Sequence, residues 1–223
     1  AFPPGHYYDG DGQFICYRKI SAVTEFSTDS QEKVLIEIRE RLIEAVRKRL
    51  VADVPVGYLL SGGLDSSLVC GIAAHVLKKP LVTFAVGLNQ NPIDLPYAKK
   101  VADFIHSEHH EVLFDRLDTI GCVRDVIWHA ESWDITTIRA SIGMYIVCKY
   151  IKQHSKIKVL LTGEVSDEIF GYKYTDFAPN AAEFQNESVK RLDELYMYDV
   201  LRADRCISAP VRFAVSTISL AER

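Results

Sequence analysis

The chain has 223 residues and a mass of 25.2 kDa, and its 48% hydrophobic and 25% charged residues are typical of a globular protein with one main core. Its net charge of −4 argues against a general nucleic-acid-binding surface, which is usually basic. No apolar run approaches the roughly 18 residues that span a bilayer, and no signal peptide opens the chain, so we expect neither a membrane segment nor secretion.

The cysteines suit reduced thiols rather than disulfides or a zinc site. They are odd in number, scattered along the chain and free of C-x-x-C spacing, a pattern typical of mostly buried thiols in a cytosolic protein. They are Cys16, Cys70, Cys122, Cys148 and Cys206.

Residues 1–30 are rich in turn-forming residues, and the stretch Asp9-Gly10-Asp11-Gly12 predicts the turn of a β-hairpin. We therefore expect this segment to be the tail of a preceding β-domain. From Gln31 to Leu50, apolar residues recur every three or four positions, which predicts an amphipathic helix with a solvated basic face.

Strands and helices then alternate along the chain. This alternation predicts an α/β fold in which a parallel sheet is covered by helices on both faces. We predict strands at residues 56–60, 81–86, 110–114 and 158–162, helices at 66–77, 94–105, 119–129 and 140–153, and a long helix at 183–208.

The stretch Ser61-Gly62-Gly63-Leu64-Asp65-Ser66-Ser67, after the first predicted strand, has the composition of a phosphate-binding turn. The two glycines lack a Cβ, so their amides can approach phosphate oxygens, and the next helix begins with unpaired amides and a partial positive charge. The serines add hydroxyl donors, whereas Asp65 would repel phosphate unless a cation lay between them. The stretch therefore predicts a magnesium-bound polyphosphate. A plain connection between a strand and a helix is the alternative.

This turn differs from the commoner phosphate loop, because no G-x-x-x-x-G-K-[ST] motif occurs and no lysine is present to hold a β/γ-phosphate pair. A loop that holds only pyrophosphate suits chemistry at the α-phosphate, and the product would be an adenylate. Ligands of parallel sheets lie beyond the carboxyl ends of the strands. Since Ser61, Val86 and Gly163 stand at such predicted ends, we expect three segments to converge on one nucleotide site.

A second acidic cluster follows the fourth predicted strand, in Thr162-Gly163-Glu164-Val165-Ser166-Asp167-Glu168. Asp167 is the natural partner of Asp65 for a magnesium ion, which otherwise keeps water and phosphate ligands. Glu164 could take a proton from an attacking amine or ammonium. An acidic helix N-terminus, favoured by the helix dipole, is the other interpretation.

Two further stretches carry weaker signals. Arg139, which we expect just before a helix, could pair with a substrate carboxylate while Thr136 donates a hydroxyl. The stretch His109-His110-Glu111 has the composition of a metal site, but the entry to a strand needs no metal, so we expect a structural role.

Five motifs together resemble the synthetase domain of the glutamine-hydrolysing asparagine synthetases, in that family's order over residues 1–209. The resemblance implies a fold of the adenine nucleotide alpha-hydrolase type, that is, a PP-loop ATP pyrophosphatase, with a C-terminal helical segment. The motifs are Ser61-Gly-Gly-Leu-Asp-Ser-Ser, Phe84-Ala-Val-Gly-Leu, Thr136-Thr-Ile-Arg-Ala-Ser, Gly163-Glu-x-Ser-Asp-Glu and Tyr198-Asp-Val-Leu-Arg-Ala-Asp-Arg.

The resemblance also implies a reaction and its participants. The side-chain carboxylate of aspartate would attack the α-phosphate of ATP to give β-aspartyl-AMP and pyrophosphate, and ammonia from a glutaminase domain would displace AMP to give asparagine. The expected partners are these small molecules and an N-terminal glutaminase domain, with a homodimer left open and with neither nucleic acid nor membrane. We expect a cytoplasmic location.

The site residues implied by the resemblance fall into four groups. Glu164 would serve the ammonia step, and Arg139 with Thr136 would orient the aspartyl group. Asp65 and Asp167 would bind magnesium. Pyrophosphate would be held by Ser61, Gly62, Gly63, Asp65, Ser66 and Ser67, and adenosine by Leu59, Val86, Thr162 and Gly163.

The chain departs from the family pattern at several points. Val165 stands where glycine is usual, the connection Lys78-Lys79-Pro80 is shorter, and residues 210–223 match neither the arginine-bearing segment nor the phosphate-contacting lysine of the family. We expect residues 1–30 to be the tail of a glutaminase-type domain with its linker, and residues 31–223 to be a synthetase domain truncated at its C-terminal end.

Two other functions stay open at this point. Another adenylating enzyme of the same fold, such as a β-lactam synthetase or a tRNA-modifying enzyme, would share the pyrophosphate loop, although the latter usually has cysteine pairs or basic patches. A nucleotide-binding module that has lost turnover would also keep this loop.

Overall fold

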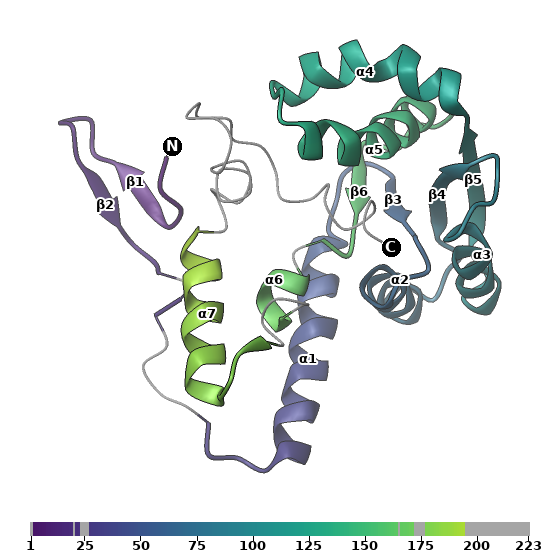
Figure 1. The fold of residues 1–223 in the computed structure, drawn as a ribbon. Helices are drawn as coiled ribbons and strands as arrows, with labels where there is room; N and C mark the ends of the chain where they lie inside the picture. Colours follow the sequence, from purple (N-terminus) through teal and green to yellow (C-terminus); the bar gives the residue numbers. More distant parts are fainter. Residues whose placement is uncertain (1, 20, 23–26, 165, 172–176, 195–223) are drawn as a thin grey trace. The chain divides into compact units, whose positions relative to one another are not determined.

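The computed structural model describes residues 2–19, 21–22, 27–164, 166–171 and 177–194 (Figure 1). They belong to two compact units. One unit comprises residues 29–164, and the other combines the described parts of residues 1–28 and 165–216. No helix within these ranges is long and apolar enough to cross a membrane.

The larger unit is built on a four-stranded parallel sheet with the strand order β5-β4-β3-β6. Tyr58 of the central strand β3 lies opposite Thr83 of β4 on one side and Leu161 of β6 on the other. Because the strands are parallel, the carboxyl ends of β3, β4 and β6 all point toward the same end of the sheet. The strands are β3 (Val56–Leu59), β4 (Val82–Leu88), β5 (Glu108–Phe114) and β6 (Val159–Leu161).

Helices cover both faces of this sheet (Figure 1). Ala85 belongs to an apolar cluster with residues of α1, α2 and α3, whereas its neighbour Phe84 packs on the opposite face against Val147 of α5. The predicted α/β fold, with a parallel sheet covered on both faces, is confirmed. The helices are α1 (Gln31–Arg49), α2 (Leu64–Leu77), α3 (Leu95–Phe104), α4 (Arg116–Ala130) and α5 (Ile135–His154).

Side-chain caps determine where three of these helices begin, because a carboxylate or hydroxyl oxygen accepts a hydrogen bond from an amide of the first turn. By contrast, α2 and α3 begin without a side-chain hydrogen bond from their N-cap residues, Gly63 and Asp94. The caps are Ser30 for α1, bonded to the Lys33 amide at 3.4 Å, Asp115 for α4, bonded to the Asp118 amide at 2.8 Å, and Asp134 for α5, bonded to the Thr137 amide at 2.7 Å.

Because of these caps, α4 and α5 begin at Arg116 and Ile135, several residues before the starts predicted at 119 and 140. The prediction that Arg139 precedes a helix is therefore wrong, since both Thr136 and Arg139 lie inside α5. Strand β4 also extends to Leu88, so Val86 lies within the strand rather than at its end.

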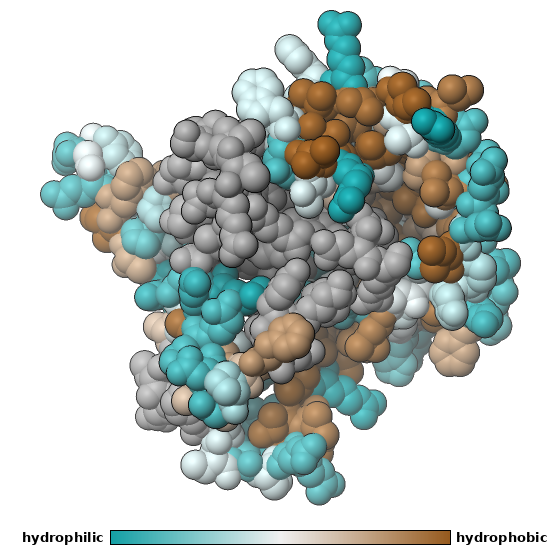
Figure 2. Space-filling model, viewed as in Figure 1, coloured by the Kyte–Doolittle hydropathy of each residue, from teal (hydrophilic) through white to brown (hydrophobic). Residues whose placement is uncertain are grey.

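The outer side of α4 is apolar and exposed, and Figure 2 shows apolar side chains gathered over α4 and α5 at the top of the view. Leu117, Ile120 and Trp128 are 76%, 60% and 79% exposed. The opposite side of α4 packs through Cys122 and Val126 against Ile142 of α5. This buried side attaches α4 to the rest of the larger unit.

The smaller unit contains the predicted hairpin, formed by β1 (His6–Tyr8) and antiparallel β2 (Phe14–Cys16). Its turn closes as predicted, with the Asp9 amide donating to the Gln13 carbonyl at 3.1 Å. Two helices, α6 (Ser166–Phe170) and α7 (Ala181–Glu194), contact each other in this unit. The remainder of the helix predicted at 183–208 lies outside the described residues, and the predicted domain boundary stays a prediction.

Asp193 of α7 connects this helix to the N-terminal segment. It accepts a hydrogen bond from the Ser21 hydroxyl, and Lys19 Nζ lies 3.4 Å from its other carboxylate oxygen. These contacts hold the pKa of the Asp193 carboxyl below its usual range, mainly through the Ser21 hydrogen bond.

Four of the five cysteines fall among the described residues, and all four are free thiols. Cys70 and Cys122 are buried, but Cys16 and Cys148 are exposed, so the prediction of mostly buried thiols is wrong for half of them. Cys16 ends an exposed two-stranded hairpin, which has too few layers to bury it. Cys206 lies outside the described residues.

Candidate functional site

The turn between β3 and α2 is closed by the side chains of Ser61 and Ser66. Their hydroxyl oxygens lie 3.0 Å apart, and the Ser61 amide donates to Ser66 Oγ at 3.2 Å. The Gly63 amide donates to Ser61 Oγ at 3.3 Å, and Ser66 Oγ donates to the Gly63 carbonyl at 3.3 Å. These two hydroxyl groups therefore hold the shape of the turn.

Gly62 and Gly163 are both required by close packing inside the larger unit. Gly62 has φ +82, and a Cβ on it would lie 2.4 Å from the Ala98 amide nitrogen of α3. A Cβ on Gly163 would lie 2.5 Å from the Ser66 amide nitrogen. The chain leaving β6 thus touches the first turn of α2, and no larger residue fits at either glycine without a shift of backbone.

The N-terminus of α2 offers unpaired backbone donors. Gly63 provides no side-chain cap, and the first amides of a helix have no acceptor within the helix. The Ser67 amide is the first of the turn to bond back, to the Gly63 carbonyl at 3.1 Å. The Ser67 hydroxyl is buried and has no hydrogen-bond partner in the part of the chain that the structure describes.

A pocket opens where β3 and β6 end, beside residues 84–86 within β4 and the start of α2. It encloses about 50 Å³. Segments far apart in the sequence therefore meet at one place, as the strand-end pattern predicts. The predicted site residues that line it are Leu59, Ser61, Gly63, Asp65, Ser66, Val86, Thr162, Gly163 and Glu164.

The other predicted site residues do not line this pocket. Gly62 and Ser67 belong to the same turn, whereas Asp167 belongs to α6 in the smaller unit. Thr136 and Arg139 lie on α5, where Thr136, Arg139 and Gly143 share one face because they are three and seven residues apart. A Cβ on Gly143 would lie 3.5 Å from the side chain of Val86, which lines the pocket. The Gly143 end of this α5 face therefore lies next to the pocket wall.

Three acidic residues line the pocket, Asp65, Asp94 and Glu164, and no lysine or arginine does so among the described residues. The Glu164 amide donates to Thr162 Oγ1 at 3.4 Å, which fixes the turn after β6. Such a set of oxygen donors suits a hard cation or cationic substrate groups. No three side chains of His, Cys, Asp or Glu are placed to hold a metal by themselves within the described ranges, so a cation here would need phosphate or water oxygens as well.

Sequence reasoning missed several residues of the pocket wall. Met144 and Val147 are three residues apart on α5, and Asp94 with Leu95 begin α3. The helical period of α5 could have identified the first pair as one face. Asp94 follows the β4 strand, so the rule that sites form beyond carboxyl ends could have identified it.

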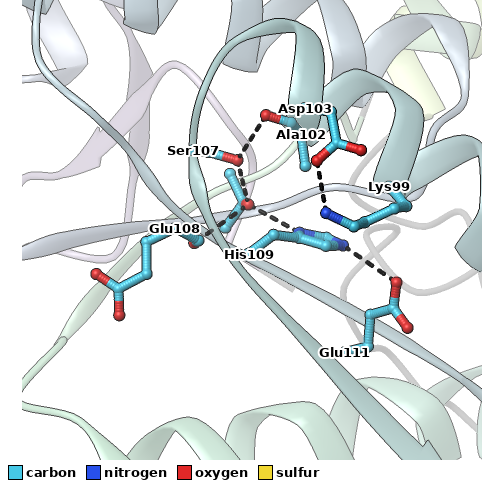
Figure 3. Close-up of polar contacts among 8 residues, drawn as sticks. Lys99, Ala102, Asp103, Ser107, Glu108, His109 and Glu111 are labelled. Carbon is cyan, nitrogen blue, oxygen red and sulfur yellow. Dashed lines mark hydrogen bonds and ion pairs between the residues drawn. The ribbon is translucent and has the colours of Figure 1, made fainter.

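His109 forms a separate buried network at the opposite end of β5, drawn in Figure 3. Its Nδ1 lies 2.9 Å from Thr83 Oγ1, which also lies 2.9 Å from Ser107 Oγ. Glu111 Oε1 is 3.9 Å from the His109 Nε2. The side chain of His109 is 4% exposed, and burial lowers its pKa. The network joins β4 to β5, so these contacts are structural.

A parallel α/β sheet whose central strand turns through Ser61–Ser67 into a helix with an open N-terminus is the architecture of the PP-loop ATP pyrophosphatases. The profile of one family within this class, asparagine synthase, matches residues 37–209. The chain belongs to the asparagine synthase family.

Curated relatives of this family are considerably longer than the chain. It is 44% identical over 229 aligned residues to a probable glutamine-hydrolysing asparagine synthetase of Schizosaccharomyces pombe. This alignment covers 94% of the chain and 41% of that protein. It is 50% identical over 184 residues to the glutamine-hydrolysing asparagine synthetase of Gallus gallus, covering 80% of the chain and 33% of that protein. The chain thus spans less than half of these relatives. Among solved structures, an NH3-dependent NAD synthetase from Campylobacter jejuni matches with a TM-score of 0.43 and 18% identity, over 76% of the chain and 83% of that structure.

Proposed function

We propose that this chain is the ATP-using part of a ligase that converts aspartate to asparagine. The side-chain carboxylate of aspartate would attack the α-phosphate of ATP, releasing pyrophosphate and leaving β-aspartyl-AMP. Ammonia would then attack the acyl carbon and AMP would leave. Membership of the asparagine synthase family supports this proposal, and the observation that carries it is the pocket shared by the open start of α2 and residues 162–164.

The pyrophosphate part of ATP would bind at the turn that contains Ser61 and Ser66. The uncapped amides of α2 supply donors there, and the helix dipole favours an anion. The buried Ser67 hydroxyl has no partner among the described residues, so it is a further donor for a phosphate oxygen. The adenosine would lie against Leu59 and Val86, and it would extend beyond the pocket, which encloses only about 50 Å³.

Magnesium would be held at this turn by Asp65, with phosphate and water oxygens completing its coordination. The donor set supports this assignment, because three acidic residues and no basic residue line the described pocket, an arrangement that would repel a polyphosphate without a cation. When bound, the ion neutralises phosphate charge. A second ligand from Asp167 stays a prediction.

Aspartate would be oriented by Arg139 and Thr136. These residues share a face of α5 with Gly143, next to Val86, and a guanidinium can bind a carboxylate through two parallel hydrogen bonds. Glu164 would take the proton that ammonia loses when its nitrogen bonds to the acyl carbon. In a longer protein, a glutaminase domain would supply that ammonia.

The test is exchange of labelled pyrophosphate into ATP by the 223-residue chain, with magnesium and a panel of amino acids. Exchange that requires aspartate supports the proposal. Exchange that requires a different acid would assign the chain another adenylated substrate. Magnesium-dependent ATP binding without exchange under any condition would identify a nucleotide-binding module and contradict the ligase assignment for this chain.

A further inference from the structure

Basic residues gather at the amino ends of β3, β4 and β6, at the end of the sheet opposite the candidate nucleotide pocket. Val56 of β3 lies opposite Val159 of β6, and Tyr58 lies opposite Thr83 of β4, so the segments that enter these strands are neighbours. With the end of α1, these segments contain seven basic residues, all of them exposed, and one acidic residue, Asp53. We call the seven the basic end of the sheet: Arg47, Lys48, Arg49, Lys78, Lys79, Lys156 and Lys158.

The basic end is continuous across the start of β3. Leu50, which follows α1, and Lys79, which follows α2, contribute to the wall of the same cavity, so these two helix ends are close together. On the other side of β3, a Cβ on Gly57 would lie 3.0 Å from Ile157, which stands between the two lysines of the segment before β6. The basic residues therefore lie on both sides of one strand.

Most of this positive charge is not neutralised by neighbouring carboxylates. Glu44 lies 2.5 Å from Arg47 and 3.9 Å from Lys48, and the basic last turn of α1 also complements the helix dipole. The lysines before β4 and β6 form no ion pair with any carboxylate in the described part of the chain. Like charges repel one another, so this end of the sheet favours an anionic partner.

Exposed apolar residues among these charges indicate the kind of partner. The loop between α1 and β3 presents Val51, which is 87% exposed, and Val54, which is 39% exposed. Cations that attract lipid headgroups, next to apolar side chains that enter the headgroup region, are typical of proteins that bind a membrane surface. Single-stranded nucleic acids are usually bound through aromatic side chains that stack on the bases, and residues 47–55, 78–80 and 156–158 contain none.

We propose that the basic end of the sheet binds the surface of a membrane that contains anionic phospholipids, with Val51 entering the headgroup region. The cations extend over three neighbouring strands, which are about 4.8 Å apart, so they match a surface with many charges better than one small anion. The chain has a net charge of −4, so the rest of it is acidic and an anionic surface repels it. The candidate nucleotide pocket, at the opposite end of the sheet, would then face away from the membrane. This inference does not depend on the ligase activity.

The test is co-sedimentation of the 223-residue chain with two sets of vesicles. One set contains phosphatidylcholine alone, and in the other about one third of the lipid is phosphatidylserine, which is anionic. We expect the chain to bind only the second set. The binding should weaken as the salt concentration rises, because salt screens the interaction between exposed charges.

Lys78→Gln combined with Lys79→Gln should weaken binding to the anionic vesicles about thirtyfold, since each lysine near such a surface contributes a factor of about five. Lys99→Gln combined with Lys100→Gln is the matched control. These two lysines are exposed in the middle of α3, outside the basic end, and their loss changes the net charge equally, so binding should be retained. Val51→Gln should weaken binding without changing its dependence on salt.

A second pair of substitutions, Lys156→Gln with Lys158→Gln, removes charge on the other side of β3 and should cause the same thirtyfold loss. Circular dichroism spectra that match the unmodified chain separate a loss of binding from a loss of fold. Equal binding to both sets of vesicles, or equal losses in the α3 control, would overturn the proposal. Binding of a single-stranded RNA through the same lysines, without binding to the anionic vesicles, would also overturn it and assign this surface to nucleic acid.

Discussion

Gly163 lies against the backbone of Ser66, so closely that a Cβ on the glycine would come within 2.5 Å of the serine amide nitrogen. Through this contact, the turn that follows β6 and the turn that follows β3 become two sides of one pocket. Asp65 and Glu164 both line it for this reason. The absence of a side chain at one position therefore determines whether the two acidic turns can meet.

Replacing Gly163 by alanine should separate these turns. We expect Gly163→Ala to lower the free energy of unfolding by about 1–3 kcal/mol, as overpacking does, and to weaken ATP binding. Urea unfolding and nucleotide titration measure the two effects. Gly121→Ala is the control, since a Cβ there meets nothing within 4 Å in the middle of α4, and it should stabilise the chain by up to about 1 kcal/mol. Equal effects of the two substitutions would contradict the packing explanation.

The adjacent serines of the turn should respond differently to removal of their hydroxyl groups. Ser66→Ala breaks the contacts with Ser61 and the Gly63 carbonyl, so it should lower the free energy of unfolding by about 0.5–1.5 kcal/mol. Ser67→Ala removes a buried hydroxyl without a partner in the described chain, so it should leave the ligand-free stability unchanged or raise it. Both are measured by thermal or urea unfolding without nucleotide. A comparable loss for Ser67→Ala would show that its hydroxyl has a partner.

Magnesium binding is tested most directly at Asp65. We expect Asp65→Asn to weaken magnesium-dependent ATP binding at least about tenfold and to abolish pyrophosphate exchange, while the circular dichroism spectrum is unchanged. Asp103→Asn provides the control, because Asp103 pairs with Lys99 on the exposed side of α3. Full exchange by Asp65→Asn would rule out the assigned magnesium ligand.

Arg139 should affect aspartate rather than ATP. Lysine cannot form the two parallel hydrogen bonds that arginine makes to a carboxylate, so Arg139→Lys should raise the aspartate KM about tenfold while the ATP affinity stays the same. The aspartate dependence of pyrophosphate exchange measures the first quantity, and calorimetry measures the second. Arg124→Lys, on exposed α4, is the control. If Arg139→Lys changed the affinity for ATP alone, the residue would belong to the nucleotide site.

His109 should make the larger unit less stable in weak acid. Burial is the main cause that lowers its pKa; Lys99 and His110 act in the same direction, and Glu111 and Asp103 oppose them. An unfolded histidine has a pKa near 6.5, so between the folded and unfolded values the unfolded chain binds more protons. As far as His109 is concerned, the free energy of unfolding is therefore at its full value above about pH 6.5 and decreases as the pH falls below that value.

This effect is measured by urea unfolding between about pH 7 and pH 5. His109→Gln should flatten the pH dependence, because the buried titrating group is gone. His75→Gln, at an exposed position of α2, should leave the slope as it is in the unmodified chain. The same slope for both variants would assign the pH dependence to other groups.

The strand and helix pattern predicted the sheet, but it did not predict where helices begin. The apolar residues that open α4 and α5, Leu117 and Ile135, are 76% and 79% exposed, so they do not continue the buried apolar period of these helices. The capping residues Asp115 and Asp134 carry the missing signal. That error moved Arg139 out of its helix. The Ser61–Ser67 turn was placed correctly because its glycines and hydroxyl groups are local in sequence.

Fewer residues of the pocket wall could be predicted from the sequence. Val86, Met144 and Val147 meet only because α5 crosses the sheet, and such a contact depends on tertiary packing rather than on a local motif. The packing role of Gly62 and Gly163 is another example. The lack of a Cβ at these glycines suggested close approach to a phosphate. The neighbouring backbone of α2 and α3 already requires glycine at both positions.

The uncapped starts of α2 and α3 face the same pocket, whereas α1, α4 and α5 complete their first turns with their own side chains. Helix α2 therefore leaves the first amides of its opening turn to be paired by whatever occupies that space, whereas the Tyr97 and Ala98 amides of α3 already donate to the Asp94 carbonyl. A ligand at a hundred times its dissociation constant adds about 2.7 kcal/mol to the stability of a folded chain. A ligand that fills this space would therefore also slow cleavage of the chain by proteases, because proteases act on the unfolded or locally opened chain.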